Sequence, residues 1–392
     1  MKRTSWIPAI ISLVLIAGCA PDLAKDTEVI NETEKNEEVA TTIIPSMQIS
    51  QEYYRTLLPY APSKSRGLVV TNIYSKYDIK EVENGLLRLS QRTFSPDDYL
   101  FQEGQMLNSE TLGNWLQRKR EEVKDKDKKK DDKPKPNIGL NPLLPGGEIT
   151  AELAKTDPMY LAHIVEQNYM VKTKDNKIKL GGVSIGLAMN SVFYYKLGDY
   201  GPYEQPIPQA TIEKQGKKMA DEIIKRMREM PGLEEVPITV GLFKQEDRNS
   251  IVPGSYFAYS VADEGKSLGE WTNINEEYVI FPQPASEVKY REVSDSFNNF
   301  KQDVEEYFSN YTSIIGTGFY QEDRIKKLTI DIPIQFYGSA ELIGFTQYMT
   351  GLVMEHFPAS MHVEVSVTSI NGPEAIVIKK ADDKEPYVHI YD

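Results

Sequence analysis

Cysteine and histidine are nearly missing from this sequence. Its 392 residues include one cysteine and four histidines. One cysteine cannot close an intramolecular disulfide, and it cannot supply the set of thiolates that structural zinc requires. No two histidines stand in the His-Glu-x-x-His spacing of zinc hydrolases, and we interpret all four as surface or helix-cap residues. The sequence therefore predicts no metal and no cofactor.

Positive charge and long apolar runs are also scarce. Lysine and arginine total 45 against 58 aspartates and glutamates, which leaves a formal net charge of −13. Nucleic-acid binding depends on basic side chains that neutralise phosphates, so we expect no nucleic-acid partner. After the first 18 residues no stretch contains the run of about 18 apolar residues that marks a membrane-spanning helix.

Recognisable catalytic motifs are missing as well. The sequence contains no Gly-x-Ser-x-Gly elbow, no glycine-rich phosphate loop and no dinucleotide fingerprint. One Ser-x-x-Lys occurs at Ser286–Lys289, but the companion Lys-Thr-Gly of penicillin-binding enzymes is not there. Since no nucleophile, base and orienting group can be assembled, we predict that the protein is not an enzyme.

The N-terminus carries a processing signal. Two basic residues precede the apolar stretch Ile7–Ile16, and Ile16-Ala-Gly-Cys19 closes it. This pattern is typical of a lipoprotein signal peptide over residues 1–18, with the only cysteine placed to accept a diacylglyceryl group. Together with an amide-linked acyl chain on the new N-terminus, that lipid would hold the protein on the extracytoplasmic face of the cell membrane. The alternative is an uncleaved N-terminal anchor with an incidental cysteine.

Composition divides the remaining chain. Residues 19–42 are acidic and lack aromatic side chains, which favours a flexible tether. Residues 43–117 form a small N-terminal block with helical and strand patterns. Residues 118–136 alternate Lys, Asp and Pro, and we interpret them as a charged linker, the alternative being a basic contact surface. Residues 137–392 hold the larger folded part.

An internal repeat runs through that larger part. Alternating strands, an amphipathic helix and two further strands recur in residues 183–262 and 328–391. Pro231 and Pro358 end the two helices, and the strand residues that follow keep the same offset of 127, as in Val240 and Val367. We predict a structural duplication; two unrelated segments that obey the same local rules are the alternative.

These patterns define the expected fold class. We predict an α+β protein built from duplicated strand-helix-strand-strand units, with amphipathic helices packed on an antiparallel or mixed sheet. The 43–117 block adds a small α/β part. A strongly amphipathic helix over residues 286–311 separates the two copies and is expected to pack across the sheet.

Tyrosine is abundant, with 23 residues, and several lie in a connection that only the first copy contains. Tyr195, Tyr200 and Tyr203 lie there among Gly and Pro. Tyrosine offers a flat stacking surface with a polar tip, so these residues are candidate ligand-binding residues for a peptide or a glycan. The alternative is that the rings only pack against one another.

Several of these features resemble the CamS family of sex-pheromone-precursor lipoproteins of Gram-positive bacteria. The resemblance rests on the Cys19 motif, Ser65-Arg-Gly-Leu-Val-Val70, the charged linker, Gly139-Leu-Asn-Pro-Leu143 and the paired C-terminal units. It implies that the released signal peptide, around Ile11–Gly18, yields a short hydrophobic peptide signal. We therefore expect a non-enzymatic surface lipoprotein, with a binding protein for a peptide, glycan or partner protein as the alternative.

Overall fold

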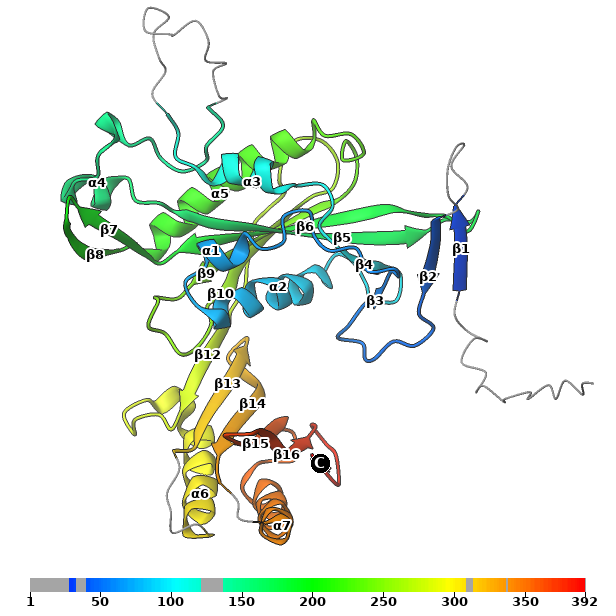
Figure 1. The fold of residues 1–392 in the computed structure, drawn as a ribbon, viewed down its shortest axis with the longest axis vertical. Helices are drawn as coiled ribbons and strands as arrows, with labels where there is room; N and C mark the ends of the chain where they lie inside the picture. Colours follow the sequence, from blue (N-terminus) through cyan, green and yellow to red (C-terminus); the bar gives the residue numbers. More distant parts are fainter. Residues whose placement is uncertain (1–27, 33–39, 121–136, 308–312, 336–337, 392) are drawn as a thin grey trace, which may run out of the picture.

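The computed structural model describes residues 28–32, 40–120, 137–307, 313–335 and 338–391 (Figure 1). The predicted signal peptide, Cys19 and linker residues 121–136 lie outside the described residues. Within the predicted tether, β1 (Glu28–Glu32) pairs antiparallel with β2 (Ala40–Ile44). The valines, isoleucines and threonines of these two segments favour extended backbone.

The larger of the two main sheets has seven strands. In spatial order they are β11 (Thr272–Asn273), β10 (Ser255–Ala262), β9 (Ile238–Gln245), β6 (Ile178–Asn190), β5 (Leu161–Lys172), β4 (Leu100–Glu103) and β3 (Arg55–Thr56). The short strands β3 and β4 come from the 43–117 block, so this block shares the sheet of the first copy.

Helices cover both faces of this sheet (Figure 1). On one face α5 (Gln209–Met227) and α3 (Ser109–Leu116) bury the large residues of β6 and β9. The 3-10 turn η2 (Pro145–Gly147) and the short helix α4 (Ala151–Thr156) follow α3 in the chain and precede β5. On the other face lie α1 (Val69–Asn72) and α2 (Lys76–Ser90).

The close approach of α2 explains why β6 alternates large with small residues. Such alternation predicts a strand with one face in solvent, yet residues 182–190 of β6 are buried throughout. A Cβ on Gly186 would lie 2.3 Å from the Tyr256 hydroxyl, and one on Gly241 of β9 would lie 2.5 Å from Leu89 of α2. The small residues thus make room for packed side chains on the α2 face, and the expectation of a half-buried strand is wrong.

The second main sheet has six strands and one covered face. In order they are β12 (Glu276–Phe281), β13 (Ile315–Gln321), β14 (Arg324–Pro333), β15 (Val363–Ser369), β16 (Gly372–Lys379) and β17 (Tyr387–Ile390). Two helices pack side by side on that face, α6 (Arg291–Tyr307) and α7 (Ser339–His356). The 3-10 turn η3 (Val288–Tyr290) leads into α6. No helix in the described ranges is long and apolar enough to span a bilayer.

The two sheets repeat one arrangement of strands, and the expected mixed α+β class is confirmed. In each, a hairpin strand leads through a helix to a parallel neighbour, which then pairs antiparallel with the next strand. The spatial order β10-β9-β6-β5 matches β16-β15-β14-β13, and β6·β9 and β14·β15 are both parallel.

The register of the repeat differs by two residues from the predicted offset. Val183 pairs with Ile238 at the start of one parallel pair, and Leu328 pairs with Val363 at the start of the other. Ile238 therefore corresponds to Val363, an offset of 125, and the predicted 127 is wrong. Because side chains alternate with period two, a shift of two residues keeps the same strand face inward, which is why the pattern looked continuous.

Candidate functional site

The predicted tyrosines lie on a separate two-stranded hairpin. Its strands are β7 (Val192–Leu197) and β8 (Tyr200–Pro206), and Tyr195 pairs across it with Tyr203. The two rings stack with centroids 5.6 Å apart, and Phe193 stacks on Tyr195 at 5.7 Å. Tyr200 begins β8 with 76 % of its surface exposed. The structure thus brings two of the three predicted residues into a ring column and leaves the third at the tip.

Both faces of the hairpin contact the main body. Phe193 is buried in the core that α3 and α5 cover, and Tyr195 packs against that core, whereas Tyr194 lies on the opposite face. Tyr194 meets Tyr74 edge-on at 5.0 Å, and the Arg248 guanidinium lies 4.5 Å from the Tyr194 ring centroid. The Arg248 backbone N–H also donates to the Tyr194 hydroxyl at 3.1 Å. These contacts orient the Phe193–Tyr195–Tyr203 column, which we call the tyrosine column, on the hairpin's other face.

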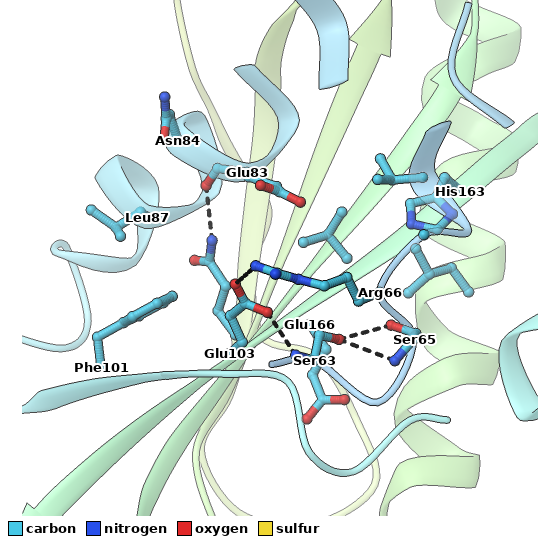
Figure 2. Close-up of a pocket in the computed structure, with 15 residues that line it drawn as sticks. Ser63, Ser65, Arg66, Glu83, Asn84, Leu87, Phe101, Glu103, His163 and Glu166 are labelled. Carbon is cyan, nitrogen blue, oxygen red and sulfur yellow. Dashed lines mark hydrogen bonds and ion pairs between the residues drawn. The ribbon is translucent and has the colours of Figure 1, made fainter. Parts of the chain in front are cut away.

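A second candidate site is a cleft beside α2, with a volume of about 230 Å³ (Figure 2). The segment Ser63–Val69 forms one wall, α2 contributes Glu83 and Asn84, and β5 contributes His163 and Gln167. These elements are far apart in the sequence. They meet because α2 packs on the face of the sheet to which alternate residues of β5 point.

An ion pair builds the outer wall of this cleft. The Arg66 guanidinium contacts Glu103 Oε1 at 2.9 Å and the Tyr60 hydroxyl, and it lies 5.3 Å from the Tyr60 ring centroid. Glu103 also accepts from the Ser63 backbone N–H at 2.6 Å and from the Tyr60 hydroxyl. The positive charge of Arg66 is thus matched within the wall, and Glu103 holds the loop that carries it.

A buried carboxylate supports the neighbouring turn. Glu166 of β5 is 4 % exposed and accepts backbone N–H bonds from Gln105, Met106 and Leu107 at 2.7–3.2 Å. A side chain on Gly104 would come within 2.7 Å of the Glu166 Cβ, so only glycine fits where the turn crosses β5. Glu166 therefore holds the turn in place, and both of its carboxylate oxygens already accept backbone hydrogen bonds.

His163 differs from its predicted surface position. It is only 3 % exposed, it lines the cleft, and its Nδ1 has no hydrogen-bond partner among the described residues. Burial lowers the pKa of His163 to about 4, so the ring is neutral at pH 7. The expectation of a surface role is wrong here because His163 faces the covered side of the sheet, which the sequence of β5 alone does not reveal.

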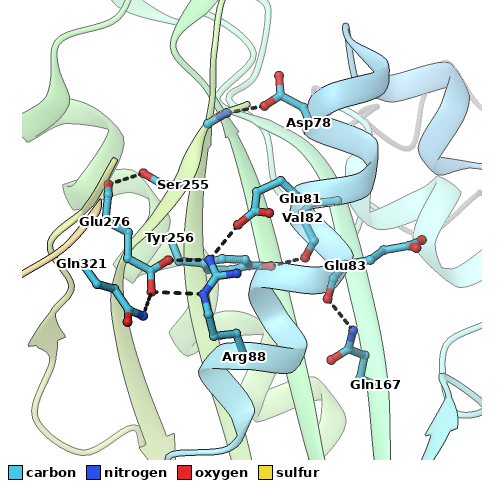
Figure 3. A network of polar contacts seen from close by, with 11 residues as sticks. Asp78, Glu81, Val82, Glu83, Arg88, Gln167, Ser255, Tyr256, Glu276 and Gln321 are labelled. Atoms are coloured by element: carbon cyan, nitrogen blue, oxygen red, sulfur yellow. Dashed lines mark hydrogen bonds and ion pairs between the residues drawn. The ribbon is translucent and has the colours of Figure 1, made fainter. Parts of the chain in front are cut away.

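A polar network joins the two sheet units at the other end of α2 (Figure 3). Arg88 Nη2 contacts Glu81 of α2 at 2.7 Å and Glu276 of β12 at 2.6 Å. The guanidinium lies 4.5 Å from the Phe319 ring centroid, and Gln321 Nε2 donates to Glu276 at 2.7 Å. Arg88 thus connects the α2 layer of the first unit with β12 and β13 of the second.

Cys19, the predicted lipidation site, lies outside the described residues. Among the described residues no group of three His, Asp or Glu is arranged to hold a metal ion. Nothing in the sequence indicated that His163, Glu83 and the Arg66–Glu103 pair line one cleft. The one available signal was the Ser65-Arg-Gly-Leu-Val-Val70 stretch, because Ser65, Arg66 and Gly67 line that cleft.

Comparison with known proteins identifies the family. Residues 60–385 match the family model described as CamS sex pheromone cAM373 precursor. The chain belongs to the CamS family. No curated protein matches it significantly.

Solved structures of CamS-type proteins share its fold. A sex pheromone precursor from Lactobacillus salivarius subsp. salivarius UCC118 is 28 % identical, covers 88 % of this chain and 98 % of its own length, and superposes with a TM-score of 0.78. The C-terminal domain of the sex pheromone staph-cAM373 precursor from Staphylococcus aureus is 34 % identical over 82 % of this chain and 98 % of its own, with a TM-score of 0.70. The α+β architecture described above is therefore that of known sex pheromone precursors.

Proposed function

We propose that this CamS-family protein is a non-enzymatic surface lipoprotein, anchored by lipid on Cys19, whose cleaved signal peptide supplies a hydrophobic peptide signal. The observation that carries the proposal is the coincidence of two facts. The chain belongs to a family of sex pheromone precursors, and its only cysteine ends the Ile16-Ala-Gly-Cys19 motif. Cleavage before Cys19 releases a peptide whose apolar end is Ile11–Gly18, while the acylated remainder stays on the membrane.

The anchoring step is tested by changing the acceptor. Cys19→Ala should abolish incorporation of a fatty-acid analogue in growing cells, because no other thiol exists to accept a diacylglyceryl group. Ala20→Ser, one position further on, should label like the parent chain. Label retained in Cys19→Ala would contradict the assignment.

The peptide step is tested separately, in the growth medium. Mass spectrometry should detect fragments that lie within residues 11–18, and their amount should fall with Cys19→Ala, since that variant is not processed. A medium that contains none of these fragments while the lipoprotein is fully processed would reject the peptide signal and leave the anchor standing.

The tyrosine column favours a second function, the binding of a glycan. Tyr203 stacks on the core-packed Tyr195 and is 42 % exposed, and the neighbouring Tyr200 is 76 % exposed. Stacking area with polar hydroxyl tips suits the apolar faces and hydroxyl groups of a sugar chain. A soluble cell-wall glycan should therefore bind the full chain, and Tyr203→Ala should weaken that binding. Tyr387→Ala, which removes a 60 % exposed ring on β17, is the matched control.

A further inference from the structure

The free edge of β17 differs from the other edges of the two main sheets. The strands β11 and β3 end the seven-stranded sheet with two residues each, and β12 begins with Glu276 and Glu277. Short strands and charged side chains keep a sheet edge from pairing with another chain. The four residues of β17, and Tyr391 after them, include no Lys, Arg, Asp or Glu. Among the strands that the structure describes, β17 is thus the main-sheet edge that lacks both protections.

The backbone groups on this edge follow from the pairing of β17 with β16. The Tyr391 N–H donates to the Glu374 carbonyl at 2.9 Å, so these two residues form a hydrogen-bonded pair. Hydrogen-bonded and non-hydrogen-bonded pairs alternate along an antiparallel ladder. Every second residue counted back from Tyr391 therefore bonds to β16. The residues between them, Val388 and Ile390, direct their N–H and C=O groups away from the sheet.

The sequence of this edge has the same pattern in both directions. His389 is flanked by the β-branched residues Val388 and Ile390, and these are flanked by Tyr387 and Tyr391. Antiparallel pairing about a twofold axis at His389 places Val388 opposite Ile390 of a second copy, and tyrosine opposite tyrosine. The outward N–H and C=O groups then face one another in both copies, which is what an antiparallel ladder requires.

Other twofold registers use this edge less well. An axis at Val388 would pair Ile390 with Pro386, which has no N–H to donate. An axis at Ile390 would use the last residue of the chain, which is charged. The register centred on His389 is therefore the one that the backbone and the side chains both favour.

One flank of α7 continues this edge in the helix layer. The helix contacts α6 on one side and lies over β16 and β17. Tyr348 and His356 make its contacts with α6. Ile343 and Met354 lie on the opposite flank, three helical turns apart, and are 44 % and 37 % exposed. No charged residue lies between them on that flank. An apolar helix flank thus adjoins the uncharged strand edge.

We infer that the β17 edge pairs with the same edge of a second copy of this chain. The six-stranded sheets of the two copies then form one continuous sheet, and the two α7 flanks meet beside it in a closed twofold contact. The first unit leaves the edge free, because it joins this sheet through β12 at the other end, and Figure 1 shows the chain end on the side away from β12. The inference is independent of the lipid anchor and of the tyrosine column.

Sedimentation equilibrium of the full chain in a mild detergent tests the inference. A Cys19→Ser background removes the only thiol, so that no disulfide links the copies. The mass should correspond to two chains at ~100 µM and fall towards one chain on dilution. A single-chain mass at every concentration would overturn the inference. An assembly larger than a dimer would overturn it as well, because a twofold contact at one edge closes after two copies.

Cysteines at two positions of β17 test the register. In the Cys19→Ser background, His389→Cys should form an intermolecular disulfide on oxidation, because the Cα atoms of this non-hydrogen-bonded pair are about 4.5 Å apart, within disulfide range. Tyr387→Cys is the matched control, since it faces Tyr391 of the second copy and lies roughly 13 Å from its own equivalent. Equal cross-linking at the two positions would contradict the twofold pairing.

Charged substitutions separate the edge from general effects on folding. His389→Lys places two ammonium groups opposite each other and should weaken dimer formation about tenfold or more. Ser366→Lys lies in the same cross-strand row, two strands from the edge, and should leave dimer formation unchanged. Met354→Glu on the α7 flank should also weaken the dimer, whereas Met47→Glu, at an 81 % exposed position outside this sheet, should not. A folded His389→Lys variant that dimerises like Ser366→Lys would reject the β17 interface.

Discussion

Lys379 occupies in the six-stranded sheet the position that Ala262 occupies in the seven-stranded sheet. Lys379 pairs with Val363, the first residue of β15, and Ala262 pairs with Ile238, the first residue of β9. Lys379 is 1 % exposed, and its ammonium group donates to three backbone carbonyls of the turn that follows α7, at 2.6–3.1 Å. The cation thus ties the turn after α7 to β16, and it adds to the backbone bonds that the Pro358 and Ala359 carbonyls already accept from Met361 and Asp382.

In the first copy an arginine performs the same task from the helix itself. Arg228 caps the end of α5 and is 4 % exposed. Its guanidinium donates to the carbonyls of Leu233, Val236 and Gly265, and also to that of Ala262 at 2.8 Å. The two copies therefore neutralise equivalent turns with cations that come from different elements.

Lys379→Met should destabilise the protein by about 3 kcal/mol, because it removes three charged hydrogen bonds that hold the turn after α7 to β16. Urea unfolding of the full chain measures the change. Lys380→Met, the exposed neighbour, should stay within about ±0.5 kcal/mol. Equal stability of both variants would show that the carbonyls find other partners.

Thr239 and Ser366 should respond oppositely to a lysine. Thr239 is fully buried under α2 and donates to the Thr93 hydroxyl at 3.0 Å, whereas Ser366 lies half-buried on the sheet face opposite α6 and α7. Thr239→Lys therefore places an unpaired charge in the interior and should cost several kcal/mol. Ser366→Lys should cost no more than about 1 kcal/mol. Similar free energies of unfolding for the two variants would mean that α2 does not seal the first sheet.

Arg88→Met should weaken the connection between the two sheet units. It leaves Glu81 and Glu276 facing each other without the cation that pairs with both, a change expected to cost about 3 kcal/mol or more. Burial raises the pKa of Glu81, so the variant should lose more stability above neutral pH than at pH 5, where protonation of the Glu81 carboxyl removes its negative charge more readily. Calorimetry at both pH values measures this. Arg92→Met, on an exposed position near the end of α2, is the control.

His163 should make stability depend on pH below neutrality. The unfolded ring binds a proton near pH 6.5, but the folded ring does so only near pH 4. The unfolded chain therefore binds more protons between these values. The stabilising contribution of His163 is complete above pH 6.5 and is lost as the pH falls towards 4, by about 3 kcal/mol in total.

Asp78 acts in the opposite sense, because burial raises its pKa from 3.8 to about 6 and stability then falls as the pH rises through that window. The difference between the parent chain and His163→Gln isolates the histidine contribution. Denaturant unfolding at pH 4.5, 5.5 and 7 should give a flatter loss of stability towards low pH in the variant. Parallel profiles would show that the His163 ring is accessible to protons in the folded state.

Much of the local structure could be predicted from residue patterns. Period-two runs located β6, β9, β14 and β15, and period-three-to-four runs located α5 and α7, because a large apolar residue has to face a core wherever it recurs. The order strand-helix-strand-strand also followed from the sequence, since short connections and right-handed crossovers leave few alternatives. The tyrosine-rich connection was located as well, although the pairing of Tyr195 with Tyr203 required the hairpin register.

The cleft could not be predicted in the same way. Glu83, Arg66 and His163 come from a helix, a loop and a strand whose patterns show only that each has an apolar face. Whether the polar residues between those apolar ones meet water depends on what packs over them.

The sequence by itself determined the strand-helix-strand-strand elements, their repeat and the position of the predicted lipidation motif, because these depend on neighbouring residues along the chain. Only the tertiary structure decided that α2 covers the second face of the first sheet, which buries Thr239 and His163. Where small or polar residues alternate with large ones along a strand, the face that carries them can lie in solvent or under a closely packed helix. The choice between them is made by residues more than 70 positions away, through contacts that no local pattern encodes.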